Sequence, residues 1–197
     1  MDARSGDSVV ATVLGEAQAD VDTVGLLLAG SRGAGQADAE SDYDFVWVLS
    51  DLAYQDRAER GGPWDVARRI AGHKVELSFA SPAVLRELAE RPSWRNPDYA
   101  TAVVLLDRGG ELGRLVEAVV AIPAERIRRD AAAGYDAYLN GFYRSVKAWR
   151  RGDELGARLQ AAESVVYLVR TLFALRGRRA PHHDRLVRQL AAVDGLG

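Results

Sequence analysis

The sequence predicts an α+β fold, in which a mixed β-sheet with flanking helices is followed by a C-terminal α-helical bundle. Up to Ile122, short runs of six or seven residues that suit strands alternate with helix-periodic segments. After Pro123 only helical periodicity continues. The charge changes at the same point: residues 1–122 carry 12 basic and 20 acidic residues, and residues 123–197 carry 14 and 8. We therefore expect two domains, 1–122 and 123–197.

The first domain is expected to combine four strands with four helices. The strands are apolar or alternating runs: Val24–Ala29, Tyr43–Leu49, Lys74–Phe79 and Thr101–Leu106. The helices are Ser8–Ala19 with Ser8 as its cap, a segment within Asp56–Ala71, Pro82–Glu90 capped by Ser81, and Glu111–Ala121. Gly61-Gly62-Pro63 is a candidate interruption of the second of these helices. Residues 30–41, rich in glycine, alanine and polar residues, are expected to form a loop.

The second domain is expected to contain the helices Ala124–Arg151, Asp153–Arg176 and Asp184–Val193. Five aromatic residues recur there at near-helical spacing and are expected to pack in the core: Tyr135, Tyr138, Phe142, Tyr143 and Trp149. The alternative is that a tyrosine such as Tyr135 contacts an acceptor molecule. Glu163 lies in an apolar helical run, where a carboxylate needs a partner such as Arg158 or Arg170, or contributes to an acceptor site.

Composition excludes several classes of protein. A hydrophobic fraction of 48% and a charged fraction of 27% are typical of a globular protein. The polar start of the chain and the lack of a long apolar run predict a cytoplasmic protein without a membrane segment. The absence of cysteine excludes disulfides and thiolate metal sites. The net charge of −2 argues against a nucleic-acid partner, while the basic helical half leaves an RNA acceptor such as a tRNA end open.

The most informative motif begins where the first strand ends, at Gly30-Ser31. A glycine there permits a tight turn, and the serine offers a hydroxyl and a backbone N–H, which are groups that hold phosphate oxygens. Asp42 and Asp44 follow at the head of the next strand, and residues two apart in a strand project from the same face. Two adjacent carboxylates repel each other unless a cation lies between them.

Glu76 lies on the polar face of the strand Lys74–Phe79 and joins the two aspartates if that strand is their neighbour. Three carboxylates beside a phosphate-binding turn predict a site for one or two Mg²⁺ ions, with Mn²⁺ as an alternative. Such ions neutralise a triphosphate during an in-line displacement. Glu76 is also a candidate general base for the hydroxyl of an acceptor.

Gly-Ser, a spacer of about ten residues, Asp-x-Asp and a later strand carboxylate together resemble the polymerase-β-like nucleotidyltransferase superfamily. Within it, Gly30-Ser31 and Ser41–Phe45 are similar to small bacterial enzymes that adenylylate aminoglycosides and lincosamides. The resemblance implies that Gly30 and Ser31 contact the β- and γ-phosphates of ATP. It also implies that Asp42 and Asp44 hold Mg²⁺, and that Glu76 binds metal or acts as base.

The resemblance extends to residues 104–107, a strand that ends in aspartate, and to the helices that follow. One position departs from the pattern. Many relatives carry an arginine where this chain has Ala34, and Arg32 is a candidate replacement that contacts the nucleotide.

The expected activity is the transfer of AMP from ATP to a hydroxyl of a small-molecule, antibiotic-like acceptor. Two alternatives stay open. One is an antitoxin-type nucleotidyltransferase that modifies a protein partner, and the other is a non-catalytic nucleotide-binding protein. Whether the chain forms a homodimer is also left open by the sequence.

Overall fold

The computed structural model describes residues 7–91, 97–178, 180 and 186–191. Contacts divide the chain into two compact units, Met1–Ala121 and Ile122–Gly197. We describe each unit by itself. Among the described residues, no helix has both the length and the apolar character needed to cross a bilayer.

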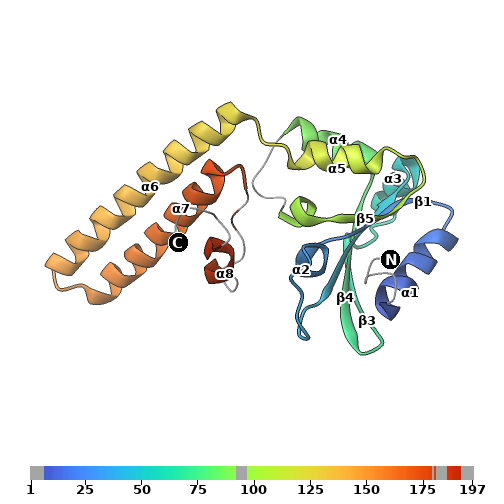
Figure 1. Ribbon diagram of the computed structural model, residues 1–197, viewed down its shortest axis with the longest axis horizontal. Helices are drawn as coiled ribbons and strands as arrows, with labels where there is room; N and C mark the ends of the chain where they lie inside the picture. The colour runs from blue at the N-terminus through green and yellow to red at the C-terminus, as the bar shows by residue number, and fades with distance from the viewer. Residues whose placement is uncertain (1–6, 92–96, 179, 181–185, 192–197) are drawn as a thin grey trace. The chain divides into compact units, whose positions relative to one another are not determined.

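The first unit is built on a five-stranded mixed sheet in the order β3-β4-β2-β1-β5 (Figure 1). The strands are β1 (Thr23–Leu28), β2 (Tyr43–Leu49), β3 (Asp65–Ile70), β4 (His73–Ala80) and β5 (Val103–Asp107). Only β2 and β4 run parallel, and the other neighbours are antiparallel. The predicted mixed sheet with flanking helices is confirmed.

Each face of this sheet is covered by a different set of helices. The helices of the unit are α1 (Ser8–Ala19), α2 (Gly30–Gly33), α3 (Asp51–Glu59), α4 (Pro82–Glu90) and α5 (Leu112–Val120), with a 3₁₀ turn η2 (Pro97–Thr101). On one face, Val9 and Val13 of α1 pack against Phe45 and Trp47 of β2. On the other face, residues of α4 and α5 pack against Val46 and Val48 of β2, and Figure 1 shows these two helices side by side.

The prediction of helix within Asp56–Ala71 is wrong for the second half of that segment. Helix α3 ends at Glu59, and Asp65–Ile70 forms the edge strand β3, which pairs with β4. The reversal between the two strands uses positive φ angles at Ala71 and Gly72, the conformation of a tight hairpin turn. Exposed and half-buried residues alternate along β3, and this period of two is the signal of a strand on an edge.

Side chains fix the ends of several elements, and only the cap of α1 differs from the expectation. The cap of α1 is Asp7, whose carboxylate accepts the N–H groups of Val9 and Val10, and not Ser8. Ser81 caps α4 as expected, with Pro82 in the first turn. Asp107 at the end of β5 accepts the N–H of Leu112, so it fixes the turn into α5.

The described part of the second unit contains an antiparallel pair of long helices and one short helix: α6 (Ala124–Arg150), α7 (Glu154–Leu175) and α8 (Leu186–Ala191). Helices α6 and α7 lie along each other in Figure 1. Gly134 and Gly141 on α6 face Thr171 and Ser164 on α7, and a Cβ atom on either glycine would come within 2.9 Å of those side chains. Small residues seven apart therefore let the two helices approach closely.

Candidate active site

The three predicted carboxylates share one face of the sheet. Asp44 on β2 and Glu76 on β4 are direct partners in the parallel register. Their neighbours Phe45, Val75 and Leu77 belong to the core under α1. Because side chains alternate along a strand, Asp44 and Glu76 project from the opposite face. The sequence placed Glu76 beside the aspartates only if their two strands are neighbours, and β4 does pair with β2.

Lys74 links this cluster. Its ammonium Nζ lies 2.9 Å from Oδ2 of Asp42 and also forms an ion pair with Glu76. The ammonium donates hydrogen bonds to Glu76, which is the larger cause, and to Asp42. Both bonds raise the pKa of Lys74 above its ordinary value. The lysine is therefore charged throughout the physiological pH range. Sequence analysis missed this role, although Lys74 stands two residues before Glu76 and so on the same strand face.

The turn at Gly30 lies directly against the carboxylate of Asp44. Gly30 has φ +57°, and a Cβ atom built on it would overlap Oδ2 of Asp44. The backbone N–H of Ala29 also donates to the carbonyl of Asp44 at 2.8 Å. Residues 30–33, expected as loop, form the single helical turn α2. Ser31 lies in the first turn of that helix, where backbone N–H groups have no carbonyl partner within the helix.

A cavity of about 330 Å³ opens beside these groups. Asp44 and Glu76 line it, together with Ala29 from the end of β1 and Ser78 from β4. Its remaining lining residues come from β2 and β3: Phe45, Val46, Asp65, Val66 and Ala67. Ligand sites commonly have volumes of several hundred cubic ångströms. The carboxylates thus have free space in front of them.

Arg32, the candidate nucleotide contact, is engaged elsewhere. Its guanidinium donates to the carbonyls of Ser41 and Asp42 at 2.8 and 3.2 Å and stacks over the ring of Tyr43, 3.6 Å from the centroid. These contacts account for the position of the Arg32 side chain without a bound phosphate. They hold the start of β2, so Arg32 positions Asp42 through the backbone.

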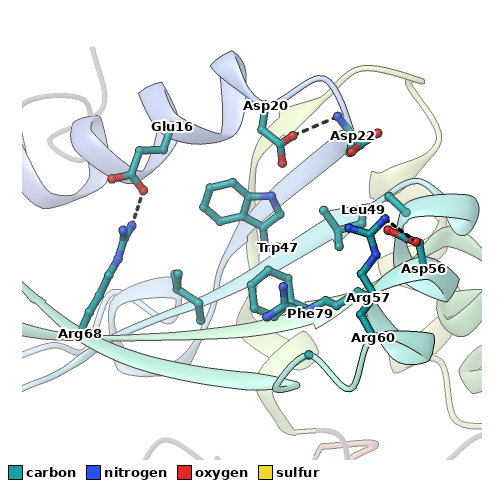
Figure 2. A pocket seen from close by; sticks show the side chains of 13 residues that line it. Glu16, Asp20, Asp22, Trp47, Leu49, Asp56, Arg57, Arg60, Arg68 and Phe79 are labelled. Atoms are coloured by element: carbon teal, nitrogen blue, oxygen red, sulfur yellow. Dashed lines mark hydrogen bonds and ion pairs between the residues drawn. The ribbon is translucent and has the colours of Figure 1, made fainter.

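A larger cavity, of about 520 Å³, lies on the opposite face of the sheet (Figure 2). Its floor is formed by Trp47 and Phe79, on the side of the α1 core. Its arginines are engaged within the protein: Arg68 pairs with Glu16, Arg60 pairs with Asp56, and Arg57 stacks on Phe79. Size alone would favour this cavity, but Asp44 and Glu76 are not part of it. We therefore place the candidate site in the smaller one.

The donor atoms of the cluster are carboxylate oxygens, which are the ligands that Mg²⁺ and Mn²⁺ prefer. Asp42, Asp44 and Glu76 supply them from one face of the sheet. No described group of three histidine, aspartate or glutamate side chains is arranged to hold a metal. Instead, Lys74 supplies the positive charge between Asp42 and Glu76. The donor set fits a hard cation in chemistry, and Lys74 is the group such a cation would compete with.

The two candidate acceptor contacts lie in the second unit. Tyr135 on α6 is 49% exposed. Glu163 on α7 is exposed too, so it does not need the ion pair that a buried carboxylate would need, and Arg158 pairs with Glu154. Both residues stay predictions as acceptor contacts.

The fold was then compared with known proteins. Neither a family model nor a curated protein matches the chain. Among solved structures, the chain is similar to a nucleotidyltransferase-like protein from Exiguobacterium sibiricum 255-15, with a TM-score of 0.50 and 15% sequence identity. The match covers 93% of this chain. The fold is nucleotidyltransferase-like.

This likeness concerns the fold alone. The match covers 61% of the Exiguobacterium protein, so this chain spans less than two thirds of its length. Substrate, metal and acceptor have to be argued from the site itself.

Proposed function

We propose that the chain is an enzyme that transfers AMP from ATP to a hydroxyl group of a small-molecule, antibiotic-like acceptor and releases pyrophosphate. The observation that carries this proposal is the placement of Asp42, Asp44 and Glu76 on one face of the sheet, with the Gly30 turn in contact with Asp44. The nucleotidyltransferase-like fold supports it. The cytoplasm is the proposed location.

In the proposed reaction, the acceptor hydroxyl oxygen attacks the α-phosphorus of ATP. The bond from that phosphorus to the bridging oxygen breaks, and pyrophosphate leaves with the bonding electrons. Glu76 accepts the proton of the hydroxyl as general base. Gly30 and Ser31 bind the β- and γ-phosphates through the turn. Asp42 and Asp44, with Glu76, would hold Mg²⁺ or Mn²⁺, which neutralises charge on the phosphates.

Transfer is tested with ATP labelled on the α-phosphate, Mg²⁺ and a panel of hydroxylated acceptors, both neutral and cationic. We expect label to appear on one class of acceptor together with an equal amount of pyrophosphate. Label found by mass spectrometry on a co-purified protein would instead identify a protein acceptor. If ATP binds but no acceptor is labelled, the chain is a nucleotide-binding protein and the proposed activity is wrong.

Lys74 is expected to oppose metal binding. Lys74→Met removes the ammonium that neutralises Asp42 and Glu76, so the carboxylates regain their mutual repulsion and attract a divalent cation more strongly. We expect the affinity for Mn²⁺, measured by calorimetry without nucleotide, to rise by about tenfold or more. Lys74→Arg keeps the charge and serves as the control. Unchanged Mn²⁺ affinity in Lys74→Met would show that the lysine does not compete with a metal.

A further inference from the structure

The five aromatic residues of α6 that were expected in the core are largely on the surface. Phe142 is 51% exposed, Tyr143 62% and Trp149 59%, and Tyr135 is similarly open. Helical spacing explains this: the residues that face α7 are Gly134, Gly141 and Ser145. The aromatic row lies about a quarter turn away from that seam at 100° per residue. Exposed apolar rows of this size mark interaction surfaces.

The aromatic row is continuous along the helix. Ring centroids of Tyr135 and Tyr138 lie 6.0 Å apart, and those of Tyr138 and Phe142 lie 6.2 Å apart. Trp149 follows Phe142 by seven residues, two helical turns, and so lies on the same side. The row therefore offers several ring faces in succession to a ligand.

A second row, adjacent to the first, is cationic. Tyr143, Lys147 and Arg150 stand at positions i, i+4 and i+7, and Lys147 lies over the ring of Tyr143, 5.4 Å from its centroid. Arg144 and Arg151 lie about half a turn from the aromatic row, on the opposite side of the helix, and all four cations are exposed. Within the part of the chain that the structure describes, none of the four forms an ion pair.

The C-terminal half of α6 thus differs from the chain as a whole. Residues 137–152 contain four basic residues and no acidic one. Cations in the last turn of a helix complement its dipole, which accounts for Arg150 and Arg151. The dipole does not account for Arg144, two turns earlier, or for the exposed aromatic rings beside the cations.

We propose that this surface of α6, made of Phe142, Tyr143, Lys147, Trp149 and Arg150, binds single-stranded nucleic acid. A partner that matches it must carry a regular row of negative charges and flat apolar groups at once. A single strand does so, because its phosphates pair with cations while its unpaired bases stack on aromatic side chains. The net charge of the whole chain, which argues against such a partner, hides this local excess.

A second copy of the chain matches the surface less well. An isologous contact would bring the cationic rows together or set them against the first half of α6. That half, residues 124–136, carries three basic and three acidic residues and has no compensating excess of negative charge. Charge complementarity therefore favours a nucleic acid.

The test is fluorescence anisotropy of the full chain with labelled 15-nucleotide single strands of RNA and of DNA, at several salt concentrations. With two cations contacting phosphates, we expect the logarithm of affinity to fall against the logarithm of salt with a slope of about −1.4. Trp149→Ala is expected to weaken binding by about five- to a hundredfold through loss of base stacking. Lys147→Gln with Arg150→Gln is expected to lower both affinity and slope.

A charge-matched control removes two exposed cations from the first unit, Arg60→Gln with Arg91→Gln, and is expected to keep full affinity. Circular dichroism verifies that each variant is folded. The proposal is overturned if no strand binds, if the control loses affinity as much as the α6 variants, or if Trp149→Ala binds unchanged. Binding only to anionic lipid vesicles, or a dimer in sedimentation that Trp149→Ala dissociates without any nucleic-acid binding, would overturn it equally.

Discussion

Asp44→Asn is expected to lower the rate of AMP transfer by at least about a thousandfold. The substitution keeps the shape of the side chain and removes its charge, at the position where Asp44 faces Glu76 and touches the Gly30 turn. Loss of a single hydrogen-bond donor to a transition state costs about 10² to 10³ in rate. A charged group required to hold the cation at the phosphates should cost at least as much. The measurement is the initial rate of label transfer under saturating ATP and Mg²⁺.

Glu40→Gln is the matched control for that variant. Glu40 lies in the loop before β2, is exposed, and loses the same charge when it is changed. We expect its transfer rate to stay within about threefold of the unmodified protein, because a remote surface charge is screened by salt. If Asp44→Asn and Asp42→Asn together retained transfer, the assignment of the carboxylates would be refuted.

Gly30→Ala is expected to cause the second large effect, on both stability and activity. At φ +57° an alanine is strained by about 1–2 kcal/mol. Its Cβ would also overlap Oδ2 of Asp44, and forcing an extra carbon into packed space costs about 1–3 kcal/mol more. We expect a loss of roughly 2–5 kcal/mol in the free energy of unfolding, measured by urea denaturation. Transfer activity should be lost with the displacement of Asp44.

Gly61→Ala separates these two causes. Gly61 has a similar φ of +66°, but a Cβ atom there meets nothing within 4 Å. This variant therefore carries the backbone strain alone, and we expect a loss of only about 1–2 kcal/mol with activity retained. Equal losses in the two variants would mean that the contact between Gly30 and Asp44 is unimportant.

The sequence predicted the central part of the fold because its signals are local. β2 was predicted with its observed bounds, and Ser81-Pro82 marked the start of α4 through its capping chemistry. The pairing of Asp44 with Glu76 was predicted only as a condition. Strand order depends on contacts between segments 32 residues apart, and a single sequence does not report them.

The errors have physical causes of the same kind. β3 was taken as helix because Arg68 and Arg69 leave few apolar residues in an edge strand that is covered only in part. The aromatic row of α6 was assigned to the core because helical spacing shows which residues share a face, but not whether another element covers it. Lys74 was visible as a polar strand residue. Its ion pair with Asp42 depends on the parallel register of β2 and β4.

The most direct test of the central claim is calorimetric titration with an ATP analogue that has a non-cleavable bond after the α-phosphate. The titration compares the unmodified protein with Asp44→Asn, each with Mn²⁺ and with a chelator. We predict that Mn²⁺ tightens binding of the analogue to the unmodified protein by at least about tenfold, or about 1.4 kcal/mol, and that Asp44→Asn abolishes this gain. Equal affinity with metal and with chelator, or an undiminished gain in Asp44→Asn, would contradict the account.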